Sequence, residues 1–137
     1  ISIARALIDS TGHEVVLVGR AENFFVGVPD LDDTLERLKA YSEAGADCLY
    51  APGIRTEQEI RAVVQAVAPK PVNVLIGWDS DLTLQTLGNM GVRRVSVGGA
   101  LARTAWGGFI QAAQGLTEGR FNFTNAAPAA ELNKRFS

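Results

Sequence analysis

Short runs of consecutive apolar residues alternate along this chain with segments whose apolar residues recur at every third or fourth position. Continuous apolar runs are typical of strands buried on both faces of a parallel sheet, and spacings of three and four are typical of helices. The pattern predicts strands over residues 15–18, 48–51, 72–76 and 94–97. It predicts helices over residues 31–44, 56–67, 82–89 and 100–116, with a short further helix over 131–136.

Polar residues and glycines at the segment ends support these helices. Asp30 is placed to cap the first one, because its carboxylate can accept a hydrogen bond from a free N–H of the first turn. Thr56 and Glu59 have the spacing of a capping box. Gly45 follows the first helix, where a left-handed residue commonly ends one. The predicted order is therefore strand then helix, four times.

Alternating strands and helices predict an α/β fold with a parallel sheet and right-handed crossovers. Four such units fit an open flavodoxin-like sheet or half of an eight-stranded (β/α)₈ TIM barrel, and periodicity alone does not choose. A whole barrel takes about 250 residues, so the 137 residues of this chain are about half of one. No linker or low-complexity segment divides the chain, and residues 1–137 are expected to form a single domain.

The composition of the chain limits the kinds of partner that it can bind. Hydrophobic residues make up 47% of the chain and charged residues 20%, with a net charge of −2. No basic stripe is present to attract a nucleic acid, and no apolar run approaches the ~20 residues that a membrane helix needs. Cys48 is the only cysteine, which excludes an internal disulfide and favours a cytoplasmic protein. We expect neither a nucleic acid nor a membrane as partner.

Candidate chemistry lies where the apolar runs stop, because active sites of parallel α/β folds lie at the carboxyl ends of the strands. The first run ends in Arg20 and Glu22, which can share one face of an extended segment. The planar guanidinium of arginine matches a carboxylate or phosphate in two-point contact. Arg20 is thus predicted to bind an anionic substrate that Glu22 helps to orient. The alternative is a structural ion pair.

The other strand ends offer weaker candidates. Asn73 is an amide within an apolar run, and it must either bind a substrate oxygen or connect neighbouring strands. Gly98 and Gly99 precede a helix, and they serve either to bind a phosphate or to allow tight packing. Gly53 supplies shape without acid–base chemistry. His13 is the only histidine and lies before the first strand, so a catalytic triad has little support.

Four motifs follow one another along the chain: Gly-Arg-Ala-Glu-Asn-Phe at 19–24, Ala-Gly-Ala-Asp-Cys-Leu-Tyr-Ala-Pro-Gly at 44–53, Pro-Val-Asn-Val-Leu at 71–75 and Gly-Val-Arg-Arg-Val-Ser-Val-Gly at 91–98. In this order they resemble the second barrel half of the isocitrate lyase / phosphoenolpyruvate mutase superfamily. The C-terminal residues 131–133 are also similar to the end of that family's chains. The resemblance covers nearly the whole chain and rests on the ordered set of motifs.

The resemblance implies a (β/α)₈ barrel of which residues 1–137 form the C-terminal half, with family strands 5 to 8 and the C-terminal helices. It implies a Mg²⁺-dependent enzyme acting on C–C or P–C bonds of small 2-oxo or 2-hydroxy carboxylates. Arg20 would contact the substrate carboxylate and Asn73 would line the site. Glu22 stands where family members often have aspartate. The absence of a glutamate near Pro52 places the chain closer to the phosphonomutase-like branch.

The family's Mg²⁺ ligands and mobile catalytic loop belong to the first barrel half, and no segment here matches them. The expected substrate-binding residues are Arg20, Glu22, Gly53, Asn73 and Gly98, with no catalytic residue and no metal ligand in this chain. We therefore expect the chain to be inactive without an N-terminal half-barrel. The resemblance also implies a homo-oligomer that exchanges the helix over residues 100–116. The alternatives are a phosphate-binding barrel enzyme of another family and a non-catalytic half-barrel that serves assembly.

Overall fold

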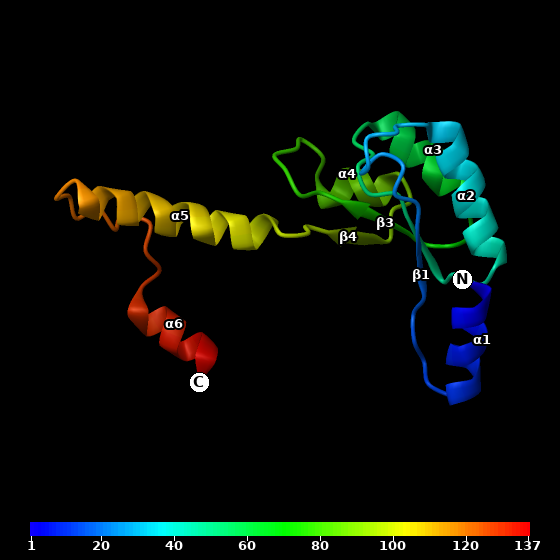
Figure 1. The fold of residues 1–137 in the computed structure, drawn as a ribbon, viewed down its shortest axis with the longest axis horizontal. Coiled ribbons are helices and arrows are strands. Elements are labelled where there is room, and N and C mark those ends of the chain that lie inside the picture. The colour runs from blue at the N-terminus through cyan, green and yellow to red at the C-terminus, as the bar shows by residue number, and fades with distance from the viewer. The chain divides into compact units, whose positions relative to one another are not determined.

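The computed structural model describes all residues of the chain, 1–137, which form two compact units, Ile1–Gly98 and Gly99–Ser137. The first unit contains every strand (Figure 1). Its elements are α1 (Ser2–Thr11), β1 (Val18–Arg20), α2 (Leu31–Glu43), β2 (Cys48–Tyr50), α3 (Glu57–Val67), β3 (Val72–Leu75), α4 (Leu84–Asn89) and β4 (Arg94–Ser96). The second unit contains α5 (Ala100–Thr117) and α6 (Ala129–Phe136).

The four strands form one parallel sheet in the order β1-β2-β3-β4. Each consecutive pair of strands is joined through a helix, so the predicted α/β architecture of four parallel strand–helix units is confirmed. The register pairs Arg20 with Tyr50, Tyr50 with Asn73, and Asn73 with Arg94. Since paired residues of parallel strands point to the same side, these four side chains form one row across the sheet.

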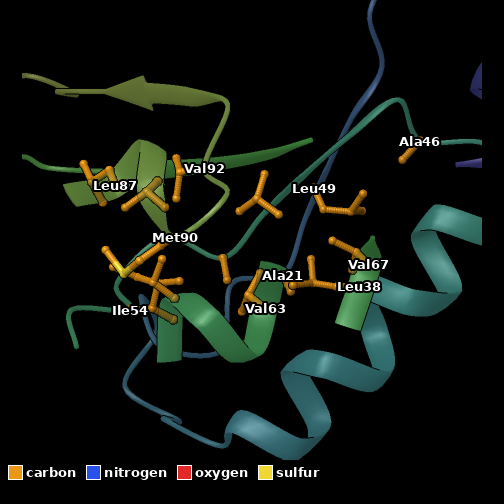
Figure 2. Packing of buried hydrophobic residues seen from close by; sticks show 14 residues of the cluster. Ala21, Leu38, Ala46, Leu49, Ile54, Val63, Val67, Leu87, Met90 and Val92 are labelled. Atoms are coloured by element: carbon orange, nitrogen blue, oxygen red, sulfur yellow. The ribbon is translucent and has the colours of Figure 1, made fainter. Parts of the chain in front are cut away.

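The hydrophobic core lies between the opposite face of the sheet and the helices (Figure 2). Leu49, Val72 and Val74 alternate along their strands with the polar row and are almost fully buried. Helices α2 and α3 contribute Leu38 and Ile60, both 0% exposed. Truncating a core leucine or isoleucine to alanine typically costs about 2–5 kcal/mol of stability. This packing fixes the strands, and with them the row that faces away from the helices.

The helix ends follow the predicted capping. The Asp30 side chain accepts a hydrogen bond from the N–H of Asp33, at 3.0 Å. Thr56 and Glu59 form a complete capping box. Burial raises the pKa of Glu59, but hydrogen bonds from the N–H groups of Thr56 and Arg55 outweigh it and leave that pKa lowered overall. Gly45 adopts a positive φ of 99° just after α2.

The segment before β1 differs from the prediction. The strand begins at Val18 rather than at residue 15, and Val15 and Val16 are 50% and 71% exposed. The physical reason is that residues before Val18 have no strand to pair with, because β2 begins only at Cys48. The N–H of Leu17 donates instead to the side-chain carboxylate of Asp47, at 2.7 Å. The other three strands match the predicted positions but end one residue earlier.

Helix α1 was not predicted, although Ile3 and Leu7 have helical spacing. Both side chains are exposed, at 86% and 66%, so the helix has no buried apolar face to stabilise it. An ion-pair network holds it instead: Arg5 contacts Asp9 at 2.7 Å and Asp47 at 2.9 Å.

The second unit contains no buried residue in either helix. The rings of Trp106 and Phe109 meet edge to face on α5, with their centroids 5.5 Å apart. Neither α5 nor any other helix combines the length and apolar character that would let it cross a membrane.

Candidate functional site

Arg20 ends β1, where the strand leaves the sheet after a last hydrogen bond from the N–H of Ala21 to the carbonyl of Tyr50, at 2.9 Å. Its Nε forms an ion pair with Oε1 of Glu22, at 2.8 Å. The guanidinium carbon lies 4.8 Å from the centroid of the Tyr50 ring, a favourable cation–π contact. Glu22 and Tyr50 therefore fix the guanidinium on two sides, and its two terminal nitrogens can still meet an anion.

A groove of about 390 Å³ opens beside Arg20, between the loop that follows β1 and helix α2. Both partners of the Arg20–Glu22 ion pair are about half exposed, at 49% and 41% of their side-chain surface. A small anion can therefore reach Arg20 from solvent. The groove is lined by Arg20, Glu22, Asn23, Val26, Val28, Asp33, Arg37 and Tyr41.

Asp33 ties this loop to α2. Its carboxylate accepts hydrogen bonds from the Asn23 amide and from Nε of Arg37, the latter at 2.6 Å. The hydrogen bond from Arg37, followed by that from Asn23, lowers the pKa of Asp33. This contact could not be predicted from the sequence, because nothing local shows that Asn23 returns to Asp33.

This network should depend on pH in a defined direction. Because the folded-state pKa of Asp33 is lowered, the network stabilises the folded state above the carboxyl's unfolded pKa of about 3.9. That contribution is lost as the pH falls through the lowered value. NMR titration of the Asn23 side-chain amide should show it released only below pH ~4. In Asp33→Asn the same resonance should not titrate, and an Asn23 signal that changes near neutral pH would contradict the assignment.

Asn73 is fully buried on β3. Its Nδ2 donates to Oγ of Ser96 on β4 at 3.0 Å, so the amide connects two strands, one of the two roles suggested by the sequence. Its Oδ1 has no hydrogen-bond partner. An unpaired buried acceptor costs about 1–3 kcal/mol, so it is a feature that needs an explanation.

Gly53 joins the loops that follow β1 and β2. It has a φ of 100°, and a Cβ there would lie 2.8 Å from Cβ of Phe24. The glycine thus allows the loop that carries Glu22 to rest on the neighbouring loop. Gly98 also has a positive φ, 53°, and a Cβ on it would lie 3.3 Å from the side chain of Leu75.

Replacing Gly53 by alanine is expected to destabilise the protein by about 2–5 kcal/mol, since a left-handed alanine costs about 1–2 kcal/mol and a crowded Cβ about 1–3 kcal/mol. Gly12→Ala is the matched control, because Gly12 has a φ of 68° with nothing within 4 Å of its added Cβ. Urea unfolding should show a clearly smaller loss for the control. Equal losses would mean that the contact with Phe24 contributes nothing.

The five predicted site residues are thus arranged unevenly. Arg20 and Glu22 form one ion pair, and Gly53 supports the loop beside them. Asn73 shares the row of Arg20 with Tyr50 between them, whereas Gly98 follows the last strand, β4. Sequence reasoning missed the contribution of Ser96, because its partner becomes visible only once the register of β3 and β4 is known.

Metal ligands are a separate question. No group of three or more His, Cys, Asp or Glu side chains lies together in residues 1–137 as metal ligands would. Glu22 is engaged with Arg20.

Comparison with known proteins places this geometry in a family. The model of the phosphoenolpyruvate phosphomutase family matches residues 1–117. An oxaloacetate decarboxylase of Rhodopseudomonas palustris (strain BisA53) is 31% identical over 80 residues, 54% of this chain and 27% of that protein. An uncharacterized protein of Mycobacterium tuberculosis (strain ATCC 25618 / H37Rv) is 29% identical over 129 residues, 93% of this chain and 48% of that protein. The chain thus spans half or less of the length of these relatives.

Solved structures are also similar to this chain. A crystal structure from Burkholderia cenocepacia J2315, described as a lyase/mutase, is 47% identical with a TM-score of 0.91, covering 98% of this chain and 50% of that one. Oxaloacetate acetylhydrolase shares the fold at 22% identity with a TM-score of 0.81, over 97% of this chain and 47% of that one. The family resemblance seen in the sequence motifs is therefore confirmed: the chain belongs to the phosphoenolpyruvate phosphomutase family.

Proposed function

We propose that this chain is the substrate-binding half of a Mg²⁺-dependent lyase or phosphonomutase-like enzyme. Its substrates are small 2-oxo or 2-hydroxy carboxylates, in which a C–C or P–C bond is made or broken. The single observation that carries the proposal is the Arg20 guanidinium, held by Glu22 and Tyr50 at the carboxyl end of β1 beside an open groove.

The chemistry of that guanidinium favours a carboxylate. With Nε bound to Glu22, the two terminal nitrogens remain as a parallel pair of donors, which matches the two oxygens of a carboxylate. Stacking on Tyr50 restricts the orientation of the guanidinium before the ligand arrives, so less conformational entropy is lost on binding. The role of this chain is to bind and orient the substrate's carboxylate.

The remaining machinery is proposed to come from an N-terminal half-barrel. Within residues 1–137, β1 and β4 each pair with a strand on one side only. Closing a barrel removes such edges, which otherwise invite pairing with other chains. The compared relatives are about twice as long as this chain or longer. We propose that the Mg²⁺ ligands lie in that other half, and that the metal stabilises negative charge developing on the substrate.

The first test is binding. Isothermal titration of the protein with pyruvate should give measurable affinity, whereas pyruvamide, which lacks the negative charge, should not bind. Arg20→Gln should abolish the binding of pyruvate. Arg61→Gln is the matched control, because Arg61 forms only an exposed ion pair with Glu57 on α3. If Arg20→Gln bound pyruvate as well as the control does, the proposal would be wrong.

We also propose a homo-oligomer that exchanges α5 between subunits. Trp106, Phe109 and Ile110 are 62%, 63% and 50% exposed, which is a large apolar surface for one helix. Sedimentation at micromolar concentration should show an oligomer that dissociates when Trp106 and Phe109 are both changed to serine. A wild-type protein that sediments as a monomer would count decisively against the exchange.

A further inference from the structure

The groove beside Arg20 contains four charged side chains that already neutralise one another in pairs. Arg20 forms an ion pair with Glu22 at 2.8 Å. On helix α2, Arg37 forms one with Asp33 at 2.6 Å. No other charged residue lines the groove. Once the terminal nitrogens of Arg20 hold one carboxylate, as proposed, the groove has an excess of negative charge.

Arg37 is less available than Arg20 for a second anion. Its Nε donates to the carboxylate of Asp33, which also accepts a hydrogen bond from the Asn23 amide. The hydrogen bond to Asp33 raises the pKa of Arg37, and a hydrogen bond with the side chain of Tyr41 raises it further. The guanidinium of Arg37 is therefore already engaged by two groups of this chain. A second carboxylate in the groove would lie close to that of Asp33, and such contacts between like charges oppose binding.

Two valines of the loop after β1 line the same groove. Val26 and Val28 are 68% and 58% exposed, so their side chains are open to a ligand. The N–H of Val26 donates to the carbonyl of Glu22 at 3.0 Å, and the N–H of Val28 donates to that of Asn23 at 2.9 Å. These backbone hydrogen bonds fix both valines relative to the ion pair of Glu22 with Arg20.

The groove has room for an apolar group beside the carboxylate. Its volume is about 390 Å³, and pockets of about 300–1,000 Å³ bind molecules larger than a three-carbon acid. Full burial of one alkyl carbon raises affinity about fourfold. An acid held by Arg20 therefore gains affinity when it carries an alkyl group that packs against the two valines.

We infer that this groove binds an apolar substituent of the substrate and rejects a second anionic group. The inference rests on the proposed carboxylate contact of Arg20 and narrows the substrate class to 2-oxo or 2-hydroxy acids with an alkyl branch. Val26 and Val28 contact the branch, and the carboxylate of Asp33 repels a charged group in its place. A second anionic group, where a substrate has one, has to lie outside the groove.

The test compares three acids by calorimetric titration of the protein without metal: pyruvate, 4-methyl-2-oxopentanoate and freshly dissolved oxaloacetate. The last two differ in carrying an isopropyl group or a carboxylate at the same position. 4-Methyl-2-oxopentanoate should bind about tenfold or more tightly than pyruvate, because it adds three alkyl carbons that the groove partly buries. Oxaloacetate should bind no more tightly than pyruvate.

Variants of the valines test which side chains give this preference. Changing Val26 and Val28 together to serine should reduce the preference for 4-methyl-2-oxopentanoate over pyruvate to about twofold or less, with the affinity for pyruvate little changed. Changing Val15 and Val16 together to serine is the matched control, because these valines are 50% and 71% exposed and do not line the groove. The control should keep the full preference.

A variant of Asp33 tests the repulsion separately. Asp33→Asn removes the charge and keeps an oxygen that can accept from Asn23. It should raise the affinity for oxaloacetate about threefold or more and leave that for 4-methyl-2-oxopentanoate nearly unchanged.

The possible failures are distinguishable. Oxaloacetate that binds as tightly as 4-methyl-2-oxopentanoate, with both lost in Arg20→Gln, would overturn this inference and leave the proposed function standing. A preference for the branched acid that survives in the serine variant of Val26 and Val28 would also overturn it. Binding of none of the three acids would overturn the inference and the proposed function together.

Discussion

Changing Arg20 to lysine is expected to weaken carboxylate binding about 10- to 100-fold, although the positive charge is kept. Lysine offers a point charge on a flexible stem and cannot reproduce two parallel hydrogen bonds to a carboxylate. It would also lose the Nε contact to Glu22 and the stacking on Tyr50 that orient the guanidinium. Hydrogen bonds to charged groups contribute about 1.5–3 kcal/mol each, which sets this range. Calorimetric titration with pyruvate measures it directly.

Because Arg20→Lys keeps the positive charge, it separates the effect of hydrogen-bond geometry from that of electrostatic attraction. Arg61→Lys is the control, and it should leave the affinity unchanged because Arg61 lies on the exposed surface of α3. Glu22→Gln should have an intermediate effect, since Nε of Arg20 then loses its charged partner but keeps a possible acceptor. If Arg20→Lys bound pyruvate as tightly as the wild type, two-point recognition by Arg20 would be refuted.

The isolated chain is expected to show no turnover above the uncatalysed rate, even with Mg²⁺ present. Residues 1–137 contain no group of three or more acidic side chains that could hold Mg²⁺ through oxygen ligands, and Glu22 forms an ion pair with Arg20. Charge that develops on the substrate would therefore lack its main stabilisation. The assay uses oxaloacetate, phosphonopyruvate and 2-methylisocitrate, first with the purified chain and then with the N-terminal half-barrel of a full-length relative added.

The two arms of that assay have opposite meanings. Turnover that appears only after the half-barrel is added, and that Arg20→Gln abolishes, would support the division of labour. Turnover by the isolated chain would refute it. Binding of pyruvate by the isolated chain in the absence of turnover is the intermediate result that we expect.

The regular part of the fold could be predicted because its signals are local. Asp30, Thr56 and Glu59 cap their helices through residues only three positions away, and each produces the same pattern in any fold. Gly45 acts in the same way at the end of α2. The alternation of strands and helices then leaves few topologies other than a parallel sheet.

The segment around β1 could not be predicted because its structure depends on distant partners. Val15 and Val16 form an apolar run that predicts a strand, yet no strand lies beside them to pair with. Arg5 holds α1 through Asp47, which is 42 positions away. An apolar pattern indicates that a segment can be buried. It does not indicate whether a neighbouring strand is present to bury that segment.

The residues of the candidate site also differ in whether their partners are local or distant in the sequence. Arg20 and Glu22 were identifiable because they are two positions apart at one strand end, and their ion pair is local. The pairing of Asn73 with Ser96 spans 23 positions and requires the register of β3 and β4. Sequence reasoning could point to Asn73 as an amide that needs partners. It could not find the serine that takes one end of the amide.

The most direct test is a crystal structure of the protein, together with its N-terminal half-barrel, bound to Mg²⁺ and pyruvate. We expect the pyruvate carboxylate in two-point contact with the terminal nitrogens of Arg20, with Mg²⁺ held by residues of the other half. Pyruvate bound away from Arg20, or no pyruvate bound at Arg20, would contradict this expectation.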